Sequence, residues 1–509
     1  MQHTTTKERE THGRAIVIGA SIAGLLAARA LADSYDQILV VERDALPEYP
    51  QPRAGTPQSY HIHRLLPRGA MILERLFPGY VDDLLASGAY SLEGKRSTMP
   101  TDHGPIMLDL PLMKVSWSRP LLEWVIRQRV QALPGVQLLT NQEVIGFCTN
   151  ADRTRVTGIS TRQRGHLDEQ TTLQADLVVD ASGRTSKLTQ WLETLGYEVP
   201  ENEQVHSLIG YSTRLYQLPE GANDEWGSVV KLTNHDGGMG ILHVENRTYI
   251  VFFGAIGGAY PPTDVAGFEH ELAHHFGTVS PDVLQDAQPL GDPRGYRIPV
   301  CVRHHFEQMD AWPAGLLVMG DALCNFDPIY GQGMSVAAIE AETLAQCLGE
   351  QPRDSRPAFE HHVLGKMQEA ISPAWWLSSI ADLNVPGATY TGPAPLKGAH
   401  IVQAYLNLYR KYALQQDRAQ LQRGEISQID FSKYFMMQGL LLPPREVINL
   451  SALTTLLTSD PSSEEQRLLA EFCQHYPAHF EEMLSEVVPD FAGAFGQDQS
   501  LAKAQVGAL

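Results

Sequence analysis

The most restrictive feature of the sequence is a glycine-containing turn between a short apolar run and a helix-like run. Residues Ala15 to Ile18 are apolar, and Gly19-Ala-Ser-Ile-Ala-Gly24 follows them. Leu25 to Leu31 then carries leucine and alanine at helical spacing, and Gln37 to Val41 is a second apolar run. This order predicts strand, turn, helix and strand, which is half of a doubly wound sheet.

The turn has the spacing of a dinucleotide-binding loop, with Ser21 in place of the middle glycine. Gly19 permits the tight turn, Gly24 lets helix and strand pack closely, and Ser21 is small enough for a phosphate to approach the backbone. Ile22 and Ala23 begin the helix, whose free N–H groups attract a pyrophosphate. The simpler alternative is an ordinary strand-helix turn.

An acidic residue, Glu42, lies 18 residues after Gly24 and is followed by Arg43. At about this spacing a carboxylate accepts hydrogen bonds from ribose hydroxyls. The same carboxylate would repel a 2′-phosphate, so the loop is expected to hold FAD or NAD rather than NADP.

A second glycine segment follows the apolar run Leu316 to Met319. It contains Gly320-Asp321-Ala322 and then Pro328-Ile-Tyr-Gly331-Gln332-Gly333-Met334, which leads into a predicted helix. Amides at a helix start stabilise an anion such as the pyrimidine end of a reduced flavin. Asp321 lies at the carboxyl end of a strand, where open α/β sheets bind ligands. The alternative is a surface loop with a helix cap.

These two segments resemble those of the p-hydroxybenzoate-hydroxylase-like (group A) flavoprotein monooxygenases, whose second motif reads GDAxH…P..GxG. The resemblance covers about residues 14 to 350. It implies that Asp321 binds the ribitol chain of FAD and that the amides from Gly331 to Met334 face the flavin ring. Pro328, Gly331 and Gln332 are the candidates that face the flavin, and no catalytic side chain is identified.

Shorter pieces extend the resemblance. Arg53-Ala-Gly is followed by Gln58, as in the family's RAG…Q loop, whose arginine approaches the cofactor phosphates as a forked donor. Arg119 begins a helix that places an arginine or glutamine against the flavin side chain, and Val144 lies on the strand that contacts adenine. The alternative for each arginine taken alone is a surface position.

The segment from Asp180 to Ser186 resembles the family's DG fingerprint, but Ser182 stands in place of the aspartate. That motif is associated with both FAD and NADPH, so direct docking of NADPH is in doubt. NADPH or NADH is the expected electron donor, either directly or through an external reductase. Together with Gly19 to Glu42 and Arg53 to Leu66, this segment is most similar to bacterial natural-product enzymes such as the polyether epoxidases and FAD-dependent halogenases. The WxWxIP motif of tryptophan halogenases is absent, which argues against halogenation.

Two pairs of histidines and one pair of tryptophans are further candidates. His61 and His63, in a loop near the expected flavin, are a covalent attachment point, an acid/base pair, or simply structural or solvent-facing residues. His304 and His305 are expected at the surface. Trp375 and Trp376 line a substrate pocket or, more commonly for aromatic pairs in helical regions, belong to the core.

The expected fold class is α/β: a Rossmann-like FAD-binding domain, glutathione-reductase-like, with an inserted β-sheet substrate domain and a helical C-terminal region. Val136 to Thr140, Glu143 to Cys148 and Leu177 to Asp180 are expected to extend the first sheet. The expected ranges are 14–200 and 291–350 for the FAD-binding domain, 201–290 for the β-rich substrate domain and 351–509 for the helical region.

Charge and composition limit the partners. The chain has 39 basic and 59 acidic residues, a formal charge of -20, which disfavours nucleic acid and anionic membranes. No apolar run is long enough to span a membrane, and Met1 to Gly13 lacks the apolar core of a secretory signal. The five cysteines form no CxxC pair, so neither a metal site nor a disulfide framework is expected, and a cytoplasmic location fits.

The resemblance therefore implies a monooxygenase that uses FAD, O2 and a small-molecule substrate. It would hydroxylate or epoxidise a fairly large apolar or aromatic secondary metabolite through a flavin C4a-hydroperoxide. Two alternatives remain: a flavin dehydrogenase or reductase without oxygen insertion, and a flavin-binding protein without turnover.

Overall fold

The computed structural model describes most of the chain between residues 13 and 495. It leaves out residues 100–105, 108–113, 166–168, 223, 233–237, 277–282, 285, 351–357, 394–395, 422–430, 460–462 and 476–479.

A five-stranded parallel sheet carries both glycine segments, in the order β19-β11-β1-β2-β7. Its strands are nearly continuous apolar runs, as a parallel sheet covered on both faces requires. The helix after the first turn packs against the helix after the second and against α4. The expected strand-turn-helix-strand unit is confirmed. The elements are β1 (Arg14–Ile18), α1 (Ile22–Leu31), β2 (Gln37–Val41), α4 (Arg119–Gln131), β7 (Val136–Leu139), β11 (Leu177–Asp180), β19 (Leu316–Val318) and α8 (Gly333–Glu350).

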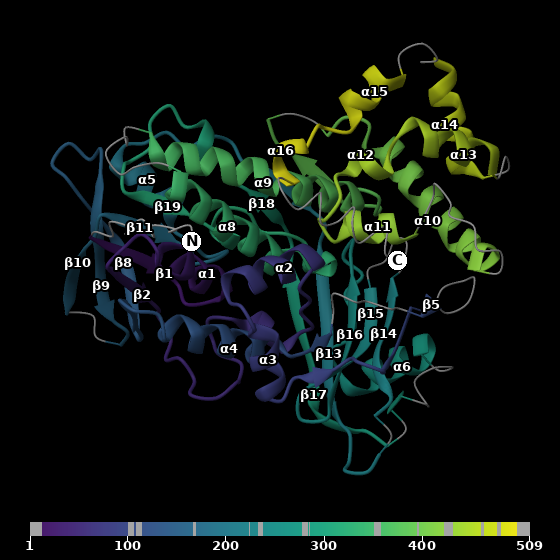
Figure 1. Ribbon diagram of the computed structural model, residues 1–509, viewed down its shortest axis with the longest axis horizontal. Coiled ribbons are helices and arrows are strands. Elements are labelled where there is room, and N and C mark those ends of the chain that lie inside the picture. Colours follow the sequence, from purple (N-terminus) through teal and green to yellow (C-terminus); the bar gives the residue numbers. More distant parts are fainter. Residues whose placement is uncertain are drawn as a thin grey trace, which may run out of the picture.

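A separate antiparallel sheet contains β8 (Gln142–Thr149), β9 (Val156–Gln163) and β10 (Gln170–Gln174), in the order β10-β9-β8. It packs against β11 of the parallel sheet, and Figure 1 shows it at the end of the molecule far from the C-terminal helices. The sequence placed Glu143 to Cys148 in the first sheet, which is wrong. A short turn after β8 lets it pair with β9 instead, because antiparallel neighbours need only a hairpin connection.

A seven-stranded sheet forms the other half of the α/β core (Figure 1), in the order β17-β13-β16-β15-β14-β4-β5. One face packs under α6 (Val265–Phe276) through Phe268, Leu272 and Phe276. Two strands of this sheet, β4 and β5, lie within residues 14–200, the range that the sequence analysis gave to the FAD-binding domain. Parallel pairing of β4 with β14 joins them to this sheet. The strands are β4 (Arg96–Met99), β5 (Ile106–Met107), β13 (Ile209–Gln217), β14 (Trp226–Leu232), β15 (Gly238–Val244), β16 (Thr248–Ala255) and β17 (Gln288–Ile298).

From residue 359 onward the described residues are mainly helical. Figure 1 shows most of the helices after residue 398 at one end of the molecule, whereas the helix that begins at residue 359 packs against α8 nearer the middle. None of the described helices has the length and apolarity needed to cross a membrane. The helices are α9 (Phe359–Asp382), α10 (Ala399–Leu421), α11 (Phe431–Gln438), α12 (Pro444–Val447), α13 (Leu450–Ser459), α14 (Glu464–His475), α15 (Phe480–Val487) and α16 (Ala492–Phe495).

Shorter elements connect these layers. A three-stranded sheet, in the order β18-β12-β20, joins the helical region to the α/β core, and β3 pairs with β6. The remaining elements are α2 (Pro67–Leu76), α3 (Tyr80–Ala86), β3 (Tyr90–Ser91), β6 (Val115–Ser116), α5 (Leu188–Leu195), β12 (Glu203–His206), β18 (Cys301–Arg303) and β20 (Thr389–Thr391).

Candidate functional site

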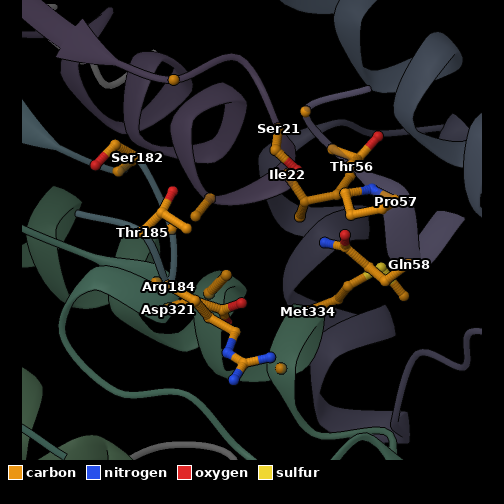
Figure 2. A pocket seen from close by; sticks show the side chains of 18 of the residues that line it. Ser21, Ile22, Thr56, Pro57, Gln58, Ser182, Arg184, Thr185, Asp321 and Met334 are labelled. Atoms are coloured by element: carbon orange, nitrogen blue, oxygen red, sulfur yellow. The ribbon is translucent and has the colours of Figure 1, made fainter. Parts of the chain in front are cut away.

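A cavity of about 410 Å³ opens where the carboxyl ends of the parallel strands meet the other two large sheets. Its wall includes both glycine turns and the loop from Arg53 to Arg64. Strand β8 and the seven-stranded sheet also contribute side chains to it. In Figure 2, Ser182 and Thr185 lie on one side of the cavity, and Thr56 and Gln58 on the other. Segments far apart in the sequence therefore form a single site.

The first turn is built around two glycines that admit no side chain. Gly19 has φ +101°, and a Cβ there would lie 2.6 Å from the carbonyl oxygen of Ala181. A Cβ on Gly24 would lie 1.8 Å from the carbonyl oxygen of Gly19, so the start of α1 packs directly on the turn. The small side chain of Ser21 accepts a hydrogen bond from Arg119 at 2.9 Å. These contacts keep the backbone of the turn open to the cavity.

Glu42 lines the cavity at the end of β2 and is held by the backbone. One of its carboxylate oxygens accepts the Ala20 amide at 2.8 Å, and the other accepts the Asp44 amide at 3.0 Å. The carboxylate thus has a fixed position beside the first turn. Its remaining lone pairs are suited to ribose hydroxyls, and this role stays a prediction.

Arg53 is buried among three carboxylates. Its guanidinium lies 3.0 Å from Glu123, 3.1 Å from Asp44 and 3.4 Å from Glu42. Burial alone would lower the pKa of Arg53, but Glu123 and Glu42 raise it, so the guanidinium stays charged. Burial likewise raises the pKa of Glu123, but Arg119 and Arg53 hold it below its usual value. Sequence reasoning found Arg53 and Glu42 but neither Asp44 nor Glu123, and it did not predict that these four side chains meet.

The second turn brings an acid and the start of α8 to the same cavity. Gly320 has φ +65°, and Asp321 and Arg184 lie together in Figure 2. Burial raises the pKa of Asp321, while the positive charges of Arg184 and Arg119 act in the opposite direction. A Cβ on Gly333 would meet no described atom within 4 Å, so the start of α8 borders open space.

These features fit a dinucleotide that carries a flavin ring. Two helix starts and a fixed carboxylate border one cavity, and Nη2 of Arg53 is buried with no hydrogen-bond partner among the described residues. A buried donor of this kind is satisfied by an anionic group such as a phosphate. FAD bound here would supply oxidation-reduction chemistry that no protein side chain provides.

Most residues predicted from the sequence line the cavity. Gly24 and Gln332 do not: Gly24 packs behind the turn, and the side chain of Gln332 is 1% exposed. Those in the wall are Gly19, Ser21, Ile22, Ala23, Glu42, Arg43, Arg53, Gln58, Arg119, Val144, Asp321, Pro328, Gly331, Gly333 and Met334.

Several lining residues were not found from the sequence. Thr56, Pro57 and Arg64 belong to the loop already singled out, so their neighbourhood was a usable signal. Tyr211 and Tyr296 come from the seven-stranded sheet, and no local pattern marks them. Strand pairing alone brings this second group to the cavity.

The paired histidines have different environments. His61 and His63 both line the cavity, but their rings are not hydrogen-bonded to each other. Nδ1 of His63 donates to the backbone carbonyl of His61 at 3.0 Å. Burial, followed by the charge of Arg119, lowers the pKa of His63 to about 3, so it is neutral. The surface position expected for His304 and His305 is wrong: His304 is half-buried and His305 is 6% exposed.

The charge on His305 has a specific cause. Its ring nitrogens lie 2.8 Å from Glu307 and 3.2 Å from Glu203. Burial opposes protonation, but the two carboxylates raise the pKa of His305 to about 9.

Trp375 and Trp376 belong to the main core and do not line the cavity.

A family model described as "FAD binding domain" matches residues 13–358, which include both glycine turns and the loop between them. The chain belongs to this family. Protein Rv3254 of Mycobacterium tuberculosis is 33% identical over 396 residues, covering 74% of this chain and 81% of that protein. FAD is therefore the cofactor, and the predicted membership in the p-hydroxybenzoate-hydroxylase-like flavoproteins is confirmed at the level of the family.

Solved structures agree on the fold. The flavin-dependent brominase Bmp2 has a TM-score of 0.58 at 14% identity, covering 92% of this chain and 99% of that one. The p-nitrophenol 4-monooxygenase PnpA of Pseudomonas putida has a TM-score of 0.50 at 17% identity, covering 73% and 88%. The chain is an FAD-dependent oxidoreductase with this fold. Its substrate, its electron donor and the similarity to polyether epoxidases stay predictions.

Proposed function

We propose that the protein is a monooxygenase that hydroxylates or epoxidises a fairly large apolar or aromatic metabolite. The observation that carries the proposal is that the cavity continues from the two glycine turns to a wall of Tyr211, Tyr296, Ile298 and Phe326. Such a wall binds an apolar molecule and excludes water beside the expected flavin ring.

The residues assigned to FAD follow the order of the cavity wall. Val144, Glu42 and Arg43 take the adenosine end, and the first turn takes the pyrophosphate. Arg53, Gln58 and Arg119 bind the phosphates and the ribityl chain, together with Asp321. Pro328, Gly331, Gly333 and Met334 border the ring, and the positive end of the α8 dipole stabilises negative charge there. When bound and reduced, FAD supplies the activation of O2: one oxygen atom enters the substrate and the other leaves as water.

The electron donor is NADH or NADPH, directly or through an external reductase. Ser182 lines the cavity, and its amide donates to Asp180 at 2.9 Å. This position carries no acidic side chain, so the nicotinamide cofactor would have to bind by other contacts. We place the reaction in the cytoplasm because all five cysteines are free thiols.

The deciding experiment measures NADH and NADPH oxidation by the FAD-loaded protein in air, with and without apolar aromatic or alkene substrates. Label from ¹⁸O₂ in the product supports the proposal. Substrate oxidation without label, with equal rates under argon and an artificial electron acceptor, would indicate a dehydrogenase. A halogenated product formed only with bromide or chloride would indicate halogenation. If no substrate were converted even with chemically reduced FAD, the result would indicate a flavin-binding protein without turnover.

A further inference from the structure

One end of the cavity is formed by paired residues of two antiparallel strands. On β13 and β17, Tyr211 lies opposite Tyr296 and Thr213 lies opposite Arg294. Because residues two apart on a strand point to the same face, Thr213 lies on the same face of the sheet as Tyr211, which lines the cavity. The wall is therefore aromatic, with a hydroxyl and a cation at its border.

His61 is fixed against this wall. Its Nδ1 lies 2.9 Å from the hydroxyl of Thr213, and its ring centroid is 5.6 Å from that of Tyr296 and 6.1 Å from that of Tyr211. The adjacent Tyr60 ring lies 3.9 Å from the guanidinium of Arg294, which holds the loop on the sheet. His61 is only 5% exposed, so its ring has little freedom to turn away.

The second ring nitrogen of His61 is available to a ligand. Within the described part of the chain, Nδ1 has Thr213 as its partner and Nε2 has none, while the residue borders the cavity. Burial, then the charge of Arg294, lowers the pKa of His61 to about 4, so the ring is neutral at neutral pH. A neutral imidazole donates at one nitrogen and accepts at the other, and the hydroxyl of Thr213 can adapt to either tautomer.

The position of His61 separates it from the nucleotide-binding features. Glu42 follows β2 of the parallel sheet and Val144 lies on β8. The ring of His61 instead lies against Thr213, Tyr211 and Tyr296 of the seven-stranded sheet. A dinucleotide that extends from Val144 to Met334 leaves this end of the cavity for a second molecule. Aromatic rings with one polar group among them favour a planar ligand with one polar substituent.

We propose that His61 binds a hydroxyl group on a planar, otherwise apolar substrate through Nε2, and that Thr213 is the positioning residue that orients the ring. The inference rests on the proposed monooxygenase function, because it places a substrate beside the flavin. His61 acts as a hydrogen-bond partner that selects and orients the substrate. Its environment disfavours an imidazolium, so it does not store the substrate's proton.

The test uses 2-naphthol and its methyl ether, 2-methoxynaphthalene, titrated into the FAD-loaded protein while the flavin absorbance is followed. The wild type is expected to bind the naphthol about tenfold more tightly than the ether, as for one buried hydrogen bond. His61→Leu should remove this preference and leave the affinity for the ether within about twofold. His61→Gln, whose amide can replace Nε2, should restore part of the preference, and Thr213→Val should reduce it.

His270→Asn, at an exposed position of α6, is the matched control and should behave as the wild type. Equal preference in the wild type and His61→Leu, or no naphthol preference in the wild type, overturns the proposal. Loss of FAD affinity in His61→Leu also overturns it, because His61 would then belong to the cofactor site. If the preference depends on His61 but no ¹⁸O label enters any product, the monooxygenase function fails while the binding role of His61 stands.

Discussion

The carboxyl group of Glu340, on α8, accepts a hydrogen bond from the amide of Gly320 at 2.6 Å. Glu340 is fully buried, and its other carboxyl oxygen has no partner among the described residues. Burial, with a smaller effect of Asp321, raises the pKa of Glu340 to about 8. The helix behind the second turn thus holds that turn through an acid that is mostly protonated at neutral pH.

This contact predicts a pH dependence of stability. Between pH 4.5 and 8 the unfolded chain loses the Glu340 proton while the folded chain keeps it, so this contribution to the free energy of unfolding falls as pH rises. Glu340→Gln mimics the protonated acid and removes the dependence. We expect the variant to gain stability relative to the wild type between pH 5 and pH 8, measured by urea unfolding with saturating FAD. If the difference in free energy of unfolding between Glu340→Gln and the wild type were the same at pH 5 and pH 8, the raised pKa of Glu340 would be contradicted.

Removal of Arg53 should destabilise the fold and weaken FAD binding. Arg53→Met leaves Glu42, Asp44 and Glu123 buried without their shared cation, at a cost of roughly 3–5 kcal/mol. Urea unfolding of the apoprotein measures the first effect, and FAD titration of the folded variant measures the second. Lys366→Met is the control: its exposed pair with Glu369 should contribute less than about 1 kcal/mol.

Two glycine substitutions should separate folding from cofactor binding. Gly19→Ala combines a positive φ with a clash against Ala181, so we expect a loss of more than about 2 kcal/mol of stability. Gly333→Ala meets no described atom, so the apoprotein should keep its stability while the new methyl group obstructs the flavin. Thermal unfolding without FAD and the Kd for FAD distinguish the two. An unaltered Kd in Gly333→Ala would place the ring elsewhere.

His305 should stabilise the fold only while it is protonated. Its pKa is raised from 6.5 to about 9, so its contribution is complete below pH 6.5 and is lost as pH rises through 9. His305→Asn should therefore destabilise the protein more at pH 6 than at pH 10 in urea unfolding. His304→Asn is the neighbouring control, because burial lowers the pKa of His304 to about 4 and leaves it neutral at both pH values. If His305→Asn lost the same free energy of unfolding at pH 6 and at pH 10, the charge on His305 would not contribute to stability.

The sequence by itself determined the two glycine turns, their strands and helices, and most of the residues that line one end of the cavity. These features depend on residues that are close together in the sequence. Examples are the glycine that the turn requires at position 19, an apolar run, and an acid at a fixed distance from a helix start, each of which can be recognised from a short stretch of sequence. Family membership follows from the same segments.

Only the tertiary structure decided which residues surround Arg53 and His61. Arg53 meets Glu123 across 70 positions of the chain, and His61 meets Thr213 across 152. Such pairs depend on strand order and on how the sheets pack, and many arrangements are compatible with the same local patterns. The expected surface position of His305 is wrong for this reason: one of the two carboxylates that keep it charged, Glu203, is brought beside it by the pairing of β12 with β18.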